Sequence, residues 1–586
     1  MSATTAAEDQ LGLPPPPPVL PPPGLGVRIR PWYDMADEVR GRLPFYSSDW
    51  SDGFSDKKVL AAGIFIFLAN VAPAVTFAFF LDSETKGSIG VVEVLLSSAI
   101  SGTIYAVLSG QPLIIVGVTG PVSVFVSTLY SLAGQLDIAF LPFLGWTTLW
   151  AALLHIVIAA SGLCGFVTYV TRFSCEIFGA LIAVVYVWNG VAELVESFRT
   201  AFAVGLLATL LAILTLTLAL VLANARAWRF WPRGVRAFIA DYAIAGSVCI
   251  ATVVSAVVIP KFQGSGDVVD HLATLNVPYR QPFLTTTSGR AWLVDFTDCP
   301  VWAVFASIIS GFVLCILFYF DHNVSSLLSQ RPESNLQKPA AFNWDFFVLG
   351  LTLVPCAFLG IPPCNGLIPQ APLHVSALSK RNKQGIVVRV AEQRISGLLQ
   401  ALFTFAILAP PLLRVVSHVP RAVLAGLFLG MAVHSLETNQ FAARAFALAC
   451  SDPIGRAAVL GSPQLSEVPK NVCTRFTLVQ VAILAVTVAI TESHSPVALL
   501  FPVVICALVP IRYFFLPRLI PSRWLDSLDC ETIDAVGDEE ESQQNASSSP
   551  LLHAALDVGP PPSVANSIPL TRVADGEDVE GRIEQT

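Results

Sequence analysis

The sequence predicts an all-α polytopic membrane protein with fourteen membrane segments. Of its 586 residues, 54% are apolar and 13% are charged, and this charged fraction is about half that of an ordinary soluble domain. Apolar runs that approach the roughly 20 residues needed to cross a bilayer recur from Val59 onward. Lys and Arg concentrate in alternate loops, as the positive-inside rule requires. These observations exclude a water-soluble enzyme and a disordered regulator.

The N-terminal segment, residues 1–58, is expected to be a Pro-rich cytoplasmic region. Proline runs at residues 14–18 and 21–23 are incompatible with a helix or a sheet and predict an extended or disordered chain. A spacer is the simpler interpretation, and a ligand for a Pro-binding module is the alternative.

Fourteen apolar runs follow, at about 59–82, 91–108, 119–132, 141–163, 173–196, 200–224, 237–259, 299–326, 343–359, 365–379, 387–409, 415–436, 474–491 and 496–517. Residues 59–260 hold the first seven and residues 299–517 the second seven. Residues 261–298 are expected to form an extracytoplasmic loop between the two groups.

The basic residues support this count. If both termini are cytoplasmic, 25 Lys and Arg fall on the inside before the far C-terminal region and 7 on the outside, which is the expected asymmetry. Residues 518–586 are expected to be an acidic, disordered cytoplasmic tail. Residues 526–586 hold 14 Asp plus Glu against 2 Arg, so this tail accounts for the acidic net charge of the whole chain.

Two of the runs, 119–132 and 365–379, are too short to cross a bilayer. Each is third in its group of seven and follows similar punctuation, Gly110-Gln111-Pro112 in one case and Gly360-Ile361-Pro362 in the other. Groups with an odd number of segments have opposite orientations, so the pattern predicts two inverted repeats with half-helices at segments 3 and 10. The alternative is that Gly and Pro only kink full-length helices.

The starts of these half-helices are the candidate site. Unpaired backbone N–H groups and a positive dipole end favour an anion at each start. Gly120 and Gly366 allow close approach of a solute to the backbone, and Pro121 in the first turn loses no needed donor. Thr119 and Asn365 are expected to act as N-caps, either with or without contact to a solute.

Asp321 is the main charge inside the predicted membrane region, at the end of an apolar run. An ionisable group at that depth is a functional-site hypothesis by default. The alternatives are a pair with His322 or a carboxylate that reaches cytoplasmic water. His374 could face the same site or could make a structural hydrogen bond.

The motifs of common enzymes are missing from the sequence. There is no HExxH, P-loop, paired-carboxylate or Ser/His/Asp arrangement, and no CxxC spacing. We therefore expect no enzymatic activity, no cofactor, no metal and no nucleic-acid partner.

Several motifs resemble the bicarbonate and borate anion-transporter family, solute carrier family 4, in its fungal and plant borate-exporter branch. The resemblance runs from about Ser48 to Glu531. The motifs are FLANVAPA at 67–74, SGQP at 109–112, VGVTGP at 116–121, SQRPE at 329–333, GIPPCNGLIPQAPLH at 360–374, EQRIS at 392–396 and LFLGM at 427–431.

The resemblance implies a core domain that moves against a gate domain, usually in a homodimer. It implies that substrate binds between the third and tenth segments beside Asp321. The implied site residues are Asn70, Thr119, Gly120, Pro121, Asp321, Asn365, Gly366, Leu367 and Gln370. The animal bicarbonate branch has Arg where Gln370 stands here, so a weakly acidic polyhydroxy solute is expected rather than chloride.

The predicted function is therefore export of borate or boric acid across the plasma membrane, in contact with membrane lipid. The alternative is exchange of bicarbonate or another inorganic anion. A sulfate or nucleobase carrier shares the repeat pattern, but a sulfate carrier would end in a soluble α/β domain. A non-transporting sensor that signals through its tails is the alternative from a different class.

Overall fold

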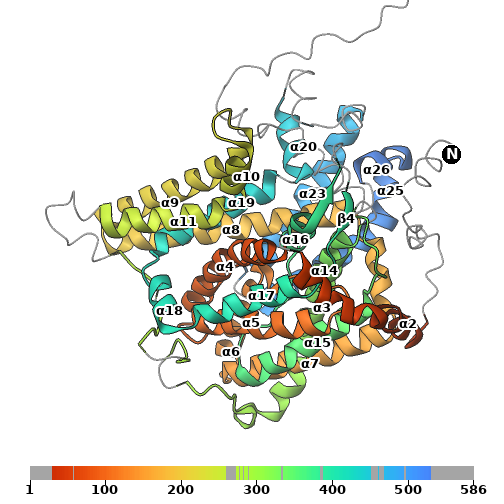
Figure 1. Ribbon diagram of the computed structural model, residues 1–586, viewed down its shortest axis with the longest axis horizontal. Coiled ribbons are helices and arrows are strands. Elements are labelled where there is room, and N and C mark those ends of the chain that lie inside the picture. The colour runs from red at the N-terminus through yellow and green to blue at the C-terminus, as the bar shows by residue number, and fades with distance from the viewer. Residues whose placement is uncertain are drawn as a thin grey trace, which may run out of the picture.

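The computed structural model describes residues 30–56, 58–258, 272–275, 277–280, 283–287, 290–331, 334–382, 387–437, 439–450, 460, 468–493 and 496–529. The protein is helical (Figure 1). In the described residues, eight helices are long and apolar enough to cross a membrane, or ten if each of two bent pairs is one span. Seven of the eight are α4 (Lys58–Glu84), α5 (Val91–Leu108), α7 (Phe140–Ala160), α8 (Arg172–Thr200), α9 (Phe202–Ala223), α14 (Val301–Ser329) and α23 (Lys470–Thr491). The eighth runs through η7 (Pro496–Leu500), α24 (Phe501–Pro510), η8 (Ile511–Phe515) and α25 (Leu516–Leu519). These spans confirm a polytopic helical membrane protein, whereas the fourteen crossings and the inverted repeats stay predictions.

The two half-helices are short, as expected. They are α6 (Gly120–Gln135) and α16 (Gln370–Leu378). At about 1.5 Å per residue, neither reaches across an apolar layer of about 30 Å.

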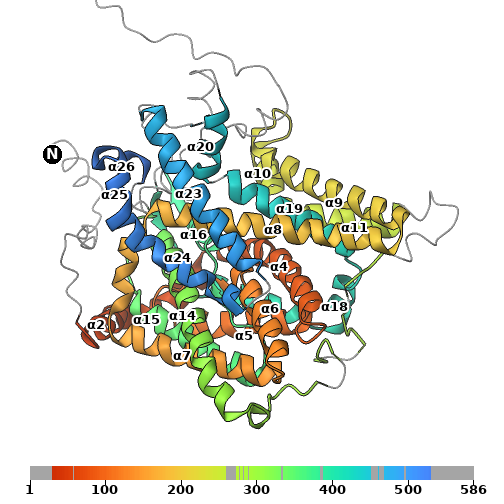
Figure 2. The ribbon, with the colours of Figure 1, turned by 180° about the vertical axis from the view of Figure 1, so that it is seen from behind.

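The helices pack into two bundles. In the first bundle, α4, α5, α7 and α14 pack with α15 (Asn343–Leu359), α16 and α17 (Ile395–Ile407), and α6 packs on α4 and α7. In the second bundle, α8, α9 and α23 pack with α11 (Ala243–Val253), α19 (Arg421–Glu437) and α20 (Gln440–Ala449). Seen from behind, the second bundle lies along one side of the first (Figure 2).

Two predicted segments are not single straight helices. Residues 237–259 were expected to be one span, but α10 (Arg233–Asp241) and α11 meet at 73°. The run at 387–409 is also wrong as one helix. Residues Val387–Val390 form strand β4, which pairs with β3 (Ser379–Arg381), and α17 meets α18 (Pro410–Val416) at 84°. The β-branched sequence VVRV favours a strand, and Pro410 and Pro411 cannot continue the hydrogen bonding of α17.

The described parts of both terminal segments contain helices that the sequence analysis did not predict. Residues before the first span form α2 (Tyr33–Arg42), η1 (Leu43–Phe45) and α3 (Tyr46–Ser55). After Leu519, α26 (Ser522–Leu528) continues the fold, and the Asp529 carboxylate pairs with Arg512 and accepts from the Phe173 backbone N–H. The predicted disordered tail therefore begins too early, because residues 518–529 are folded. The Pro-rich run and the acidic residues after Asp529 lie outside the described residues.

Candidate functional site

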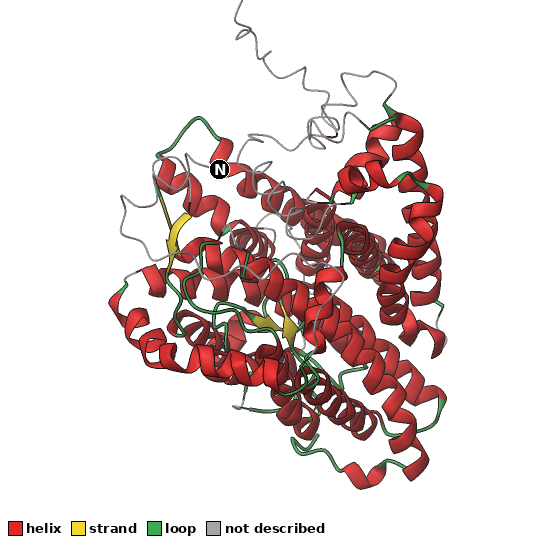
Figure 3. Cartoon of the chain, turned by 90° about the vertical axis from the view of Figure 1, so that its right-hand side faces the viewer, coloured by secondary structure: helices red, strands yellow, loops and turns green. Residues whose placement is uncertain are grey.

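Two very short strands pair inside the first bundle. Strand β1 (Val116–Gly117) pairs antiparallel with β2 (Asn365–Gly366), and the Leu367 backbone N–H donates to the Ile115 carbonyl at 2.9 Å. This pairing supplies hydrogen bonds to extended backbone that would otherwise be costly in an apolar interior. Figure 3 shows this pair as the yellow strands near the centre of the view, enclosed by helices. The starts of the two half-helices therefore lie at the ends of one small sheet.

The start of α6 has the predicted geometry. Thr119 is the N-cap, its hydroxyl accepts from the Val122 backbone N–H at 3.4 Å, and Pro121 lies in the first turn. The Gly120 N–H needs no partner within the helix at this position. The structure thus confirms the Thr119 cap, and the dipole of α6 gives this end a partial positive charge.

The start of α16 differs from the prediction. Asn365 is not the N-cap, because α16 begins five residues later at Gln370, after Pro369, with no side-chain cap. Pairing with β1 holds Asn365 and Gly366 in an extended conformation, so the helix cannot start there. Gln370 is 9% exposed, and its carbonyl oxygen Oε1 has no hydrogen-bond partner in the described part of the chain.

Asp321 lies on α14 beside this sheet and is 2% exposed. Its Oδ2 accepts from Asn365 Nδ2 at 3.3 Å, whereas Oδ1 has no partner among the described residues. His322 makes no hydrogen bond to it and instead packs against Tyr105, with ring centroids 5.7 Å apart. The predicted alternative of an Asp321–His322 pair is therefore wrong.

Space for a side chain is restricted at the centre of the sheet, most of all at Gly366. A Cβ on Gly366 would lie 2.8 Å from His322 Nδ1, and a Cβ on Gly117 would lie 3.3 to 3.4 Å from Leu367 and Asn70. Leu367 and Asn70 are 5% and 3% exposed. The structure thus brings Asn70 and Leu367 together around β1 and β2, as the predicted site requires.

His374 is structural. Its Nδ1 lies 2.8 Å from the Leu113 carbonyl oxygen and its Nε2 lies 2.7 Å from the Ser396 hydroxyl. Both ring nitrogens are occupied, so this side chain ties α16 to its neighbours and does not face a solute.

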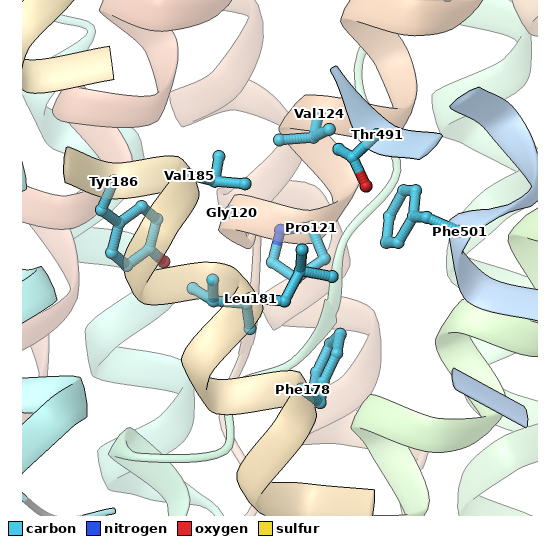
Figure 4. A pocket seen from close by; sticks show the side chains of 10 residues that line it. Gly120, Pro121, Val124, Phe178, Leu181, Val185, Tyr186, Thr491 and Phe501 are labelled. Atoms are coloured by element: carbon cyan, nitrogen blue, oxygen red, sulfur yellow. The ribbon is translucent and has the colours of Figure 1, made fainter. Parts of the chain in front are cut away.

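A small hollow, part of it open to the outside, lies where α6 faces the second bundle. Its lining is mostly apolar and comes from α6, α8, α23 and α24, as the side chains in Figure 4 show. Of the predicted site residues, only Gly120 and Pro121 line it. Asp321, Asn365 and Gln370 lie deeper, among the strands and helices of the first bundle.

Tyr186 is the site residue that the sequence analysis missed. It reaches from α8 to the start of α6, where a Cβ on Gly120 would lie 2.6 Å from its hydroxyl oxygen. An aromatic residue in an apolar helix carries no local signal of such a role, so only the packing of the two bundles reveals it.

The described residues contain no group of three His, Cys, Asp or Glu side chains that could hold a metal ion. The groups that the candidate site offers are helix-start N–H groups, one buried carboxylate, the amides of Asn70, Asn365 and Gln370, and one tyrosine hydroxyl.

Comparisons with known proteins show which proteins this chain is similar to. The family model described as the HCO3⁻ transporter integral membrane domain matches residues 30–203 and 198–533. Boron transporter 1 of Saccharomyces cerevisiae is 35% identical over 86% of each chain. A putative transporter of Schizosaccharomyces pombe is 35% identical over 86% of this chain and 95% of its own length.

Two further proteins are similar to this chain at lower identity. The Band 3 anion transport protein of Rattus norvegicus is 29% identical over 86% of this chain but 55% of its own length. The solved structure of SLC26A9 covers 84% of this chain and 73% of its own with a TM-score of 0.52. At 14% identity, that likeness concerns the fold alone.

Proposed function

Because the chain belongs to the HCO3⁻ transporter family, as a membrane anion transporter related to boron transporters, we propose that it exports borate or boric acid from the cytosol. The proposed transport is secondary or facilitative and takes place at the plasma membrane, with both termini cytoplasmic. We further propose fourteen segments in two inverted repeats and a homodimeric assembly.

The observation that carries the proposal is that the start of a half-helix and a buried carboxylate occur in the same bundle. The start of α6 offers backbone N–H groups, and Asp321 Oδ1 is a buried acceptor without a protein partner in the described residues. Borate carries several B–OH groups, each able to accept a hydrogen bond at oxygen and to donate one to a carboxylate. A solute with both abilities satisfies the donors and the acceptor together, whereas chloride has no proton to donate to Asp321.

The proposed roles follow from this geometry. The N–H groups at Gly120 and the first turn of α6 bind a substrate oxygen, favoured by the positive helix end. Asp321, held by Asn365, accepts from a substrate hydroxyl, and Gln370 contributes its amide at the start of α16. Movement of the first bundle against the second, in the manner of an elevator, then carries the bound solute past Tyr186.

The test is borate efflux from cells that overexpress the protein, compared with Asp321→Asn. The substitution keeps the size of the side chain but removes the charge, and hydrogen bonds to charged groups contribute about 1.5–3 kcal/mol. We expect efflux to fall about 10- to 150-fold. The matched control is Asp298→Asn, at an exposed aspartate in the short 3₁₀ helix before α14, and it should transport normally.

Two outcomes would contradict the proposal. Normal efflux by correctly folded Asp321→Asn protein would remove Asp321 from the site. Purified wild-type protein in proteoliposomes that moves bicarbonate but not borate would favour the second candidate, an inorganic anion exchanger, which the similarity to rat Band 3 supports.

A further inference from the structure

The connection between α9 and α11 has an unusual composition. Residues 224–241 comprise η3 (Asn224–Ala227), a short linker and α10; we call them the basic aromatic segment. They contain four arginines and one aspartate, a net charge of +3. The arginines and aromatic residues are Arg226, Arg229, Arg233 and Arg236 with Trp228, Phe230, Trp231 and Phe238. None of these features serves the proposed transport site.

Three of the four aromatic side chains of this segment are exposed. Phe230, Trp231 and Phe238 are 58%, 62% and 62% exposed, and Trp228 stacks on Phe230 with ring centroids 5.0 Å apart. No residue of α10 is buried. Helical spacing places Phe238 on one side of α10 with the partly exposed Val235. The protein itself therefore leaves an apolar surface uncovered here.

Most of the positive charge lacks a carboxylate partner. Arg226 pairs with Asp241 at 2.5 Å. Arg236 donates to the carbonyl oxygens of residues 226 and 228, which neutralise no charge. Arg229 and Arg233 are exposed and have no ion pair among the described residues. An anionic partner is thus favoured at the same surface that exposes the aromatic rings.

The position of the segment restricts what that partner is. Its N-terminal end continues α9, which is long and apolar enough to span a membrane, and its C-terminal end joins α11. With a bend of 73° between α10 and α11, α10 runs close to the membrane plane if α11 crosses. Figures 1 and 2 show α10 at the ends of α9 and α11. Two membrane helices therefore hold this surface at the bilayer boundary.

We propose that the basic aromatic segment is a binding surface for anionic phospholipid in the cytoplasmic leaflet. Aromatic rings prefer the headgroup level of a bilayer, and arginines near the surface attract phosphatidylserine-type headgroups. The apolar side of α10 lies against the acyl boundary, while Arg229 and Arg233 contact headgroup phosphates. The lipid tethers the edge of the second bundle at a fixed depth.

The test measures binding of fluorescent phosphatidylserine and phosphatidylcholine to delipidated, detergent-solubilised full-length protein. Each basic residue near an anionic surface contributes about a fivefold factor. Arg229→Glu with Arg233→Glu should therefore weaken phosphatidylserine binding by at least about 30-fold and leave phosphatidylcholine binding unchanged. The matched control is Arg40→Glu with Arg518→Glu, two exposed arginines elsewhere on the predicted cytoplasmic side. The melting temperature of each variant shows that it is folded.

Each other outcome overturns the proposal. Equal loss in the control would assign the effect to net charge. If soluble glycerophosphoserine competes as well as unlabelled phosphatidylserine does, the segment is a simple anion site and not a lipid-binding surface. Unchanged phosphatidylserine binding, combined with lost transport in cells, would assign the surface to an acidic protein partner.

Discussion

Replacing Gly120 with alanine tests whether contact between the two bundles controls access to the site. A Cβ at this position would lie 2.6 Å from the Tyr186 hydroxyl oxygen and 2.8 Å from its ring carbon Cε1. Real Cβ contacts are not that short, so one side chain or helix must move. The Tyr186 ring is held by Phe77 and Phe428, whose centroids lie 5.9 and 5.8 Å away.

The size of the effect follows from this packing. Inserting a methyl group into a filled space costs about 1–3 kcal/mol, which lowers the population of the conformation with α6 against α8 about 5- to 150-fold. We expect borate efflux to fall in the same range, because the proposed elevator movement passes through this conformation. The assay is initial efflux rate normalised to the amount of protein at the cell surface.

Gly134→Ala is the matched control on the same helix. Nothing lies within 4 Å of a Cβ at Gly134, so this variant should transport normally. Tyr186→Ala removes the obstructing ring, so adding Gly120→Ala to it should cause no further loss. The reasoning is refuted if Gly120→Ala matches Gly134→Ala, or if its effect is undiminished in the Tyr186→Ala background.

Three further predictions concern groups outside the proposed substrate contacts. The Arg421 guanidinium on α19 lies 4.5 Å from the ring centroid of Phe79 on α4. Arg421→Ala should lower the population of the conformation in which these two helices pack together about 2- to 30-fold relative to other conformations. Spin labels on α4 and α19 should then show a new distance population. Burial raises the pKa of Glu38, which caps α15. Glu38→Gln should therefore have a higher melting temperature than wild type near neutral pH. The difference between the two melting temperatures should vanish as the pH falls toward 4.5. Arg444 is fully buried and paired with Glu176; Arg444→Ala should destabilise the protein by about 3–5 kcal/mol, measured by thermal unfolding in detergent.

Controls for these three come from exposed residues. Arg199 and Glu196 form a surface ion pair at 2.8 Å, which should contribute less than about 1 kcal/mol. Arg199→Ala should therefore leave stability and bundle distances unchanged, and Glu196→Gln should show no pH-dependent difference from wild type. The Arg444 prediction is wrong if Arg444→Ala and Arg199→Ala have the same melting temperature. The Arg421 prediction is wrong if Arg421→Ala leaves the distance distribution unaltered. The Glu38 prediction is wrong if the melting temperatures of Glu38→Gln and wild type differ by the same amount at every pH.

The sign of the Glu38 effect is set by the direction of its shift. A carboxyl group whose pKa is raised on folding prefers its protonated form in the fold. That preference stabilises the protein fully below the ordinary pKa of 4.5 and is lost as the pH rises through the higher, folded value. Glutamine imitates the neutral form at every pH, so the difference between variant and wild type is largest when Glu38 is ionised.

Local patterns in the sequence were enough to locate most helices and part of the site. Apolar runs of sufficient length are a property of neighbouring residues, so α4, α5, α7 and α14 could be predicted within a few residues. The Thr119 cap and Pro121 are also local, because a helix start depends on a few consecutive residues.

The remaining features depend on residues that are distant in the chain. Asn365 has the composition of a cap, yet it lies in β2 because Gly117, about 250 residues earlier, supplies its hydrogen-bonding partner strand. Glu38 precedes the first span but caps α15 through the Trp344 N–H at 2.7 Å. Tyr186 reaches the start of α6 only because the two bundles pack there.

The sequence by itself determined the class of this protein, its family and the start of α6, since these rest on composition, apolar length and local motifs. Only the tertiary structure decided that Asn365 holds Asp321, that Tyr186 faces Gly120 and that α10 bends away from α11. The physical reason is that hydrogen bonds and close contacts between distant segments depend on how helices pack, and periodicity along one segment carries no record of its partner.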